Sequence, residues 1–126
     1  MSRSKSEENH QLEHRILLQL FQLIADLRNP EETKIFLEGV LTDVELNTLV
    51  KRIAILYCLQ QGWSYDQIRE ALQVSSATIA GMQTKLANDP GAALALKKIQ
   101  ADEWANKWTG KILQWLGVRR YAGTPG

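Results

Sequence analysis

The stretch that most constrains the fold of this chain runs from Ser64 to Lys85, where the sequence indicates two short helices joined by a tight turn. Ser64 is a good N-cap, and Gln67, three residues later, completes a capping box. Ile68 and Leu72 follow at a spacing of four, which places both on one face of a helix. The segment therefore predicts a short first helix that begins just after Ser64 and has one apolar face.

A turn at residues 73–75 follows, with Val74 as its one large apolar residue. Ser75 is placed to cap a second helix, with Thr78 at its third position. The apolar stripe of that helix has spacings of three and four and consists of Ile79, Met82 and Leu86. Two such helices crossed over a three-residue turn make a helix-turn-helix at residues 64–86. Its second helix is short enough to enter a DNA major groove end-first.

The exposed face of the second helix carries small or hydrogen-bonding groups, which tolerate a close approach to base edges. Its N-terminal hydroxyls and free backbone N–H groups can hold a phosphate. Gln83 is the one residue on this face long enough for a two-point contact, which suits adenine. Two cations, on the first and second helices, supply charge for the DNA backbone. The predicted DNA-binding residues are Arg69, Ser75, Ser76, Ala77, Thr78, Ala80, Gln83, Thr84 and Lys85. With no arginine on the second helix, DNA shape and bridging waters should carry much of the specificity.

The rest of the chain has helical periodicity, so the predicted fold class is all-α with six helices. The other four helices are expected at residues 11–28, 30–39, 42–61 and 92–116, with N-caps at Asn29 and Thr42. Gly62 is placed to end the long helix, which would be the scaffold for the two short ones. Residues 11–116 would form a single helical domain, between a flexible N-terminal arm at 1–10 and a basic flexible tail at 117–126.

Charge is unevenly distributed along the chain. Residues 1–41 hold five basic and seven acidic side chains, and residues 42–89 hold four and five. Residues 90–126 hold six basic and two acidic ones, so the positive charge lies in the C-terminal third. The helix-turn-helix is therefore not basic, although DNA affinity comes largely from neutralising phosphates. This is the strongest sequence argument against DNA binding.

Several functional classes find no support in the sequence. The single cysteine, Cys58, allows no intrachain disulfide and suits a reducing cytoplasm. The polar start indicates no signal peptide, and no apolar run reaches the length of a membrane helix. No phosphate loop, metal-binding spacing or catalytic set is present, so we expect no enzyme activity, no cofactor and no membrane partner. His10 and His14 lie one helical turn apart, but two imidazoles alone make a poor metal site, and solvated histidines are the better interpretation.

Both ends of the chain carry more apolar surface than one small domain can cover. The first helix has a wide apolar face, and the last has an apolar stripe that includes Trp104, Trp108 and Trp115. Each tryptophan buries on the order of 200 Å². We therefore expect packing against the first helix of the same chain or of a partner, and a base-stacking role for these rings is the weaker alternative.

Leu41–Gln83 resembles the core of the Trp repressor family of bacterial regulators. The resemblance lies in the Leu41-Thr42 opening, the Arg52-Ile53 pair, Leu59 with Gly62, the pair Ile68 and Leu72, and the string Ala77-Thr78-Ile79. It implies an interleaved two-fold homodimer that presents two helix-turn-helices to double-stranded DNA. It also implies an effector pocket in which two arginines sandwich a ligand.

This sequence departs from the family pattern at the effector pocket. Arg52 matches the first arginine, but Gly81 stands at the second position. Without that charge, we expect free tryptophan to bind poorly or not at all, and a different small-molecule effector stays possible. Arg52 would otherwise reach the surface or pair with Glu45 or Asp66.

Three functions remain open on this evidence. The first is a sequence-specific, homodimeric DNA-binding regulator, expected to act as a repressor. The second is a helical interaction dimer that keeps the fold without reading DNA. The third is an effector-binding sensor with no direct DNA role.

Overall fold

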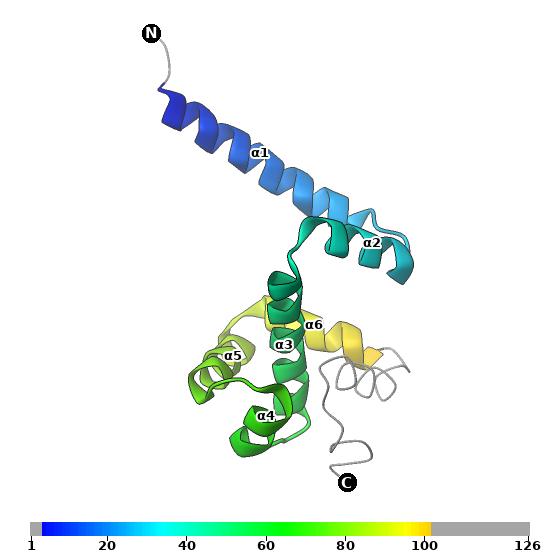
Figure 1. The fold of residues 1–126 in the computed structure, drawn as a ribbon, viewed down its shortest axis with the longest axis vertical. Helices are drawn as coiled ribbons and strands as arrows, with labels where there is room; N and C mark the ends of the chain where they lie inside the picture. The colour runs from blue at the N-terminus through cyan, green and yellow to red at the C-terminus, as the bar shows by residue number, and fades with distance from the viewer. Residues whose placement is uncertain (1–3, 102–126) are drawn as a thin grey trace. The chain divides into compact units, whose positions relative to one another are not determined.

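The computed structural model describes residues 4–101, and within that range it contains six α-helices and no strand (Figure 1). The prediction of an all-α, six-helix fold is confirmed for this range. The helices are α1 (Lys5–Ala25), α2 (Pro30–Val40), α3 (Asp43–Gln60), α4 (Tyr65–Leu72), α5 (Ser76–Asn88) and α6 (Pro90–Ala101).

The sequence predicts a single helical domain over residues 11–116. In the structure the chain separates into two compact units, Met1–Asp43 and Val44–Gly126. The division falls at the start of α3. The reason is visible in the burial pattern, because every buried apolar residue among those described belongs to the second unit. We therefore describe each unit by itself.

The first unit contains α1 and α2. Asn29 caps α2 as predicted, since its side-chain oxygen accepts a hydrogen bond from the Glu32 backbone N–H at 2.8 Å. Pro30 occupies the first turn, where its missing N–H leaves no gap in the hydrogen bonding. The helix continues through Gly39 to Val40 instead of ending at the glycine. Neither α1 nor α2 contains a buried residue.

The sequence predicts a flexible arm at residues 1–10, whereas α1 begins at Lys5 within that range. Ser4 is its N-cap and accepts a hydrogen bond from the Glu7 backbone N–H at 3.1 Å. Glu7 and Glu8 then lie in the first turn, where the positive end of the helix dipole favours acidic groups. The N-cap and the favourable dipole interaction thus allow α1 to begin before residue 11, where the apolar periodicity predicts its start.

The second unit has a core built from four helices and the loop after α3. α3 contributes Ala54, Ile55, Leu56 and Cys58, the loop contributes Trp63, α4 contributes Ile68, Ala71 and Leu72, α5 contributes Ile79 and Met82, and α6 contributes Ala92 and Leu96. Ile55, Ile68, Leu72 and Ile79 are the largest fully buried side chains. The helix-turn-helix therefore shares its core with α3 and α6.

A Schellman motif ends α3 and directs the chain into α4. Gly62 has φ +83°, and its N–H donates to the Leu59 carbonyl at 3.1 Å. The Trp63 N–H donates to the Cys58 carbonyl at 3.0 Å, which completes the motif. Trp63 and Cys58 both belong to the core of the second unit. The predicted role of Gly62 is confirmed.

α6 begins at Pro90, close to the predicted start of the last helix, and is described up to Ala101. The predicted continuation to residue 116, the tryptophan stripe and the tail at 117–126 lie outside the described residues.

Candidate nucleic-acid interface

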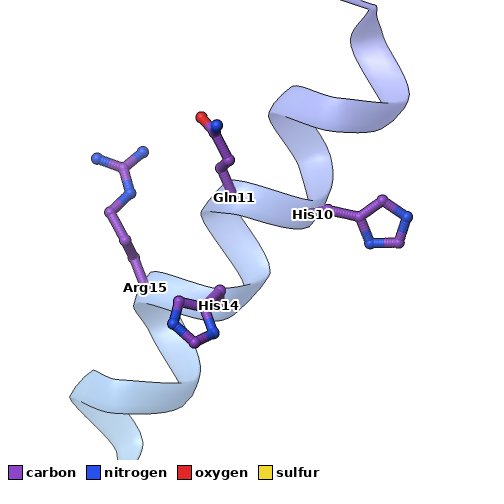
Figure 2. Close-up of a pocket in the computed structure, with 4 residues that line it drawn as sticks. All are labelled: His10, Gln11, His14 and Arg15. Carbon is purple, nitrogen blue, oxygen red and sulfur yellow. The ribbon is translucent and has the colours of Figure 1, made fainter.

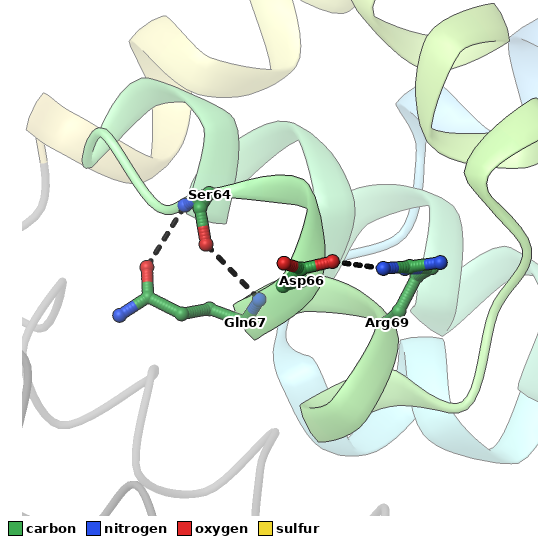
Figure 3. A network of polar contacts seen from close by, with 4 residues as sticks. All are labelled: Ser64, Asp66, Gln67 and Arg69. Atoms are coloured by element: carbon green, nitrogen blue, oxygen red, sulfur yellow. Dashed lines mark hydrogen bonds and ion pairs between the residues drawn. The ribbon is translucent and has the colours of Figure 1, made fainter.

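The first helix of the motif, α4, is held at its N-terminus by the predicted capping box (Figure 3). The Gln67 backbone N–H donates to Ser64 Oγ at 3.1 Å, and the Ser64 backbone N–H donates to Gln67 Oε1 at 2.8 Å. Ile68, Ala71 and Leu72 are buried along one face. Local hydrogen bonds and one apolar stripe therefore fix both the start and the orientation of α4.

The turn between α4 and α5 depends on a left-handed residue. Gln73 has φ 57° and ψ 50°, and its backbone N–H donates to the Arg69 carbonyl. Its side-chain Nε2 donates to the Glu70 carbonyl at 3.0 Å, which supports the turn without a glycine. Ser75 then caps α5, because its Oγ accepts from the Thr78 backbone N–H at 3.1 Å and lies 2.9 Å from Thr78 Oγ1. The predicted three-residue turn is confirmed.

All nine predicted DNA-binding residues are exposed in this chain, from Arg69 on α4 to Lys85 on α5. The predicted stripe of α5 faces the opposite way, since Ile79 and Met82 are buried and Leu86 is half-buried. The buried and exposed faces of α5 thus separate as the sequence indicated. Which of the nine residues contact DNA stays a prediction.

Gln83, expected to read a base with both ends of its amide, already has a protein partner. The hydroxyl of Tyr65, the first residue of α4, donates a hydrogen bond to Gln83 Oε1. Tyr65 is half-buried and packs against the core. Sequence reasoning missed this residue because the two side chains are 18 positions apart and meet through the crossing of α4 and α5.

The two cations of the motif differ in their surroundings. Arg69 forms an ion pair with Asp66, one turn earlier on the exposed side of α4 (Figure 3). Lys85 is exposed and has no ion pair with another described residue. Because pairs between exposed groups contribute little to stability, a phosphate can compete for the Arg69 guanidinium.

The two expected effector residues, Arg52 and Gly81, are both exposed in this chain. Arg52 is exposed, and the structure records no ion pair between it and another described residue. Asp66, one of its two expected partners, pairs with Arg69 instead, because Arg69 lies one turn away on the same helix. Gly81 is also exposed, and a Cβ built there would meet nothing within 4 Å. The position has room for a side chain, so the absence of the second arginine is not forced by packing.

Cys58 is a core residue of α3. Desolvation by burial raises the pKa of its thiol from 9.0 to about 12. A neutral, buried thiol is a poor nucleophile and a poor metal ligand. It therefore serves packing in the folded chain.

His10 and His14 line an open depression on α1 together with Gln11 and Arg15 (Figure 2). The two imidazole rings are exposed and extend from successive turns of the helix. Arg15 also lines the depression, and its positive charge disfavours a cation there. Among residues 4–101, no group of three or more side chains is arranged to hold a metal ion. The same part of the chain contains no helix that is both long and apolar enough to span a bilayer.

Comparison with known protein families gives a match that covers most of the chain. Residues 15–100 match the family described as Trp repressor protein. The matched range begins within α1 and ends within α6, so it includes the whole helix-turn-helix. No curated protein and no solved structure matches the chain at a significant level.

Proposed function

Because this chain belongs to the Trp repressor family, we propose that it is a sequence-specific DNA-binding regulator that acts as a homodimer through α4 and α5, with repression as its mode of action. The family is one of DNA-binding regulators. We propose a cytoplasmic location as well, because such a regulator must reach chromosomal DNA. One observation supports it most directly. α5 has a buried apolar face and an opposite, exposed face of residues that are either small or able to hydrogen-bond, beginning with the capping residue Ser75.

That face offers chemistry suited to a major groove. Ser75 and Ser76 lie at the N-terminus of α5, where hydroxyls and the helix dipole favour a phosphate. Ala77 and Ala80 are exposed and leave the backbone free to approach base edges closely. The nine residues from Arg69 to Lys85 thus form the proposed DNA interface.

A second copy of the chain is the proposed partner of α1. This helix of 21 residues has no buried residue. Eight of its large apolar side chains are between 37% and 58% exposed: Leu12, Ile16, Leu17, Leu18, Leu20, Phe21, Leu23 and Ile24. Covering such a face with the same face of another chain would remove several hundred Å² of apolar surface from water. A two-fold dimer would present two α5 helices to successive major-groove turns, so a roughly palindromic site is expected.

A small-molecule effector of this regulator would differ from the ligand that two arginines sandwich in the family pattern. Arg52 and Gly81 are the proposed effector-binding positions, and Gly81 supplies no charge for a carboxylate. We propose that free tryptophan is not the ligand. Calorimetry that gave micromolar affinity for L-tryptophan would contradict this.

Duplex binding measured by fluorescence anisotropy tests the proposal. Affinity should fall steeply between about 50 and 200 mM salt, because phosphate contacts release counterions. Gln83→Ala should cost about 1–3 kcal/mol on a selected site and little on random duplex, whereas Lys85→Ala should weaken both about equally. If neither change affects binding to any duplex, α5 is not the reading helix, and the interaction dimer becomes the better function.

A further inference from the structure

The hydrogen bond between Tyr65 and Gln83 links the two helices of the proposed DNA interface. Tyr65 is anchored, because its ring packs against the core of the second unit. Gln83 is exposed on the face of α5 that carries the predicted DNA-binding residues. The tyrosine hydroxyl donates to the amide oxygen of Gln83. The orientation of an exposed side chain is thus set by a half-buried one on the neighbouring helix.

This contact changes what the amide can recognise. A glutamine side chain has one acceptor oxygen and one NH₂ group with two donor hydrogens. The two-point contact with adenine needs both, since the oxygen accepts from N6 and the nitrogen donates to N7. In this chain the oxygen accepts from Tyr65, and Gln83 Nε2 has no recorded partner among the described residues. The oxygen of Gln83 keeps a second lone pair, but the hydrogen bond from Tyr65, and not a base, sets the direction in which that lone pair points.

We propose that Tyr65 is a positioning residue that makes Gln83 a donor-only reader of the major groove. A donor selects base edges that present acceptors, and guanine presents two of them, N7 and O6. Cytosine presents the N4 amino group, which is itself a donor, and should be rejected. The inference rests on the proposed function, because it requires α5 to lie in a major groove.

Selection of bound sites from a randomised duplex pool tests the inference with the full chain. The wild type should prefer guanine at one position of each half-site, and Gln83→Ala should lose the preference at that position alone. Tyr65→Phe removes the hydroxyl and frees the amide to rotate, so the adenine-to-guanine ratio there should rise on the order of tenfold. Tyr57→Phe is the matched control, because it removes a hydroxyl from a tyrosine of α3 that also packs against the core.

A purely structural role for Tyr65 would lower the thermal stability and the affinity for every duplex, without changing base preference. Should Tyr65→Phe fail to fold, Gln83→Glu carries the test. Its carboxylate is an acceptor, so the preferred base should change from guanine to cytosine at the same position.

The outcomes separate this inference from the proposed function. This inference alone is overturned if the wild type binds with a base preference and Tyr65→Phe keeps that preference unchanged. Where Gln83→Glu carries the test, an unchanged preference in that variant has the same meaning. A wild-type preference for adenine at the Gln83-dependent position does the same. A wild-type chain that binds no duplex overturns the proposed function and this inference with it.

Discussion

At the scale of single residues, Asp66 is the side chain that most directly opposes the proposed DNA contact. Its carboxylate pairs with Arg69, and both groups are exposed, at 84% and 47% of the side chain. To contact a phosphate, Arg69 must leave this pair, and the carboxylate would then lie near the negative DNA backbone. Asp66→Asn should therefore tighten binding to every duplex severalfold, because it removes one repulsive charge from the interface.

Anisotropy titrations on a selected site and on random duplex would measure this gain. Glu38→Gln is the matched control, because Glu38 also forms an exposed ion pair, with Lys34 on α2 at 3.1 Å. That variant should leave DNA affinity unchanged. Equal affinities for Asp66→Asn and the wild type would place Arg69 outside the DNA contact.

Because of the buried thiol of Cys58, the free energy of unfolding should depend on pH in the alkaline range. Its folded pKa of about 12 exceeds the usual value of 9.0, so above pH 9 the unfolded chain loses this proton while the folded chain keeps it. The free energy of unfolding should therefore fall between pH 9 and pH 12, by at most about 1.4 kcal/mol per pH unit from this group. Urea melts at pH 8 and pH 10.5 would show the fall, and Cys58→Ala should show a smaller one. An identical fall in both proteins would assign it to other groups.

At the scale of helices, α5 contains a residue that weakens it. Gly81 lies in the middle of the helix, is exposed, and has nothing within 4 Å of a built Cβ. Gly81→Ala should raise the free energy of unfolding by about 0.5–1 kcal/mol, because alanine loses less backbone entropy on folding. Gly62→Ala should lower it by about 1–2 kcal/mol, because φ at that position is +83°. Chemical denaturation of both variants should give opposite signs, and equal signs would contradict this account of α5.

The ends of the helices could be predicted from sequence wherever a local signal exists. Asn29, Ser64 and Ser75 each accept a hydrogen bond from a backbone N–H three residues later, so the spacing in the sequence specifies the contact. Gly62 was predictable for the same reason, since a left-handed residue after a helix favours glycine. Gln73 adopts the same conformation without being glycine, and no propensity indicates it.

Contacts between helices were not predictable from local patterns. The hydrogen bond from Tyr65 to Gln83 depends on how α4 crosses α5, and spacing along one helix does not contain that angle. Trp63 was also missed as a core residue, although it directly follows a glycine that ends α3. An apolar residue after such a glycine packs back onto the helix in a Schellman motif, and that signal could have identified it.

At the scale of the whole molecule, the apolar face of α1 determines the assembly that we propose. Ile16 is 56% exposed in the single chain. If a second copy covers it, Ile16→Lys should bury a charge at the contact and dissociate the dimer toward a mass of 14.3 kDa. Light scattering at micromolar concentration would measure this.

Gln22→Lys is the matched control on the same helix. Gln22 Nε2 donates to Asp26 Oδ1 at 3.0 Å, and a lysine there keeps an acidic partner one turn away. This variant should keep the mass of the wild type. A wild-type chain that is monomeric at these concentrations would contradict the proposed homodimer.

The uncovered face of α1 also bears on the synthesis of the protein. α1 precedes the whole core of the second unit in the chain, so it leaves the ribosome before any of that core exists. At about 5–20 residues per second, translation from the end of α1 to the last core residue, Leu96, takes roughly 4–14 s. During that interval the leucine, isoleucine and phenylalanine side chains of the nascent helix are exposed to water, as such side chains are in the substrates of holding chaperones. Neighbouring ribosomes on one messenger would bring two such helices together, so pairing of the nascent chains is the earliest step at which this surface can be protected.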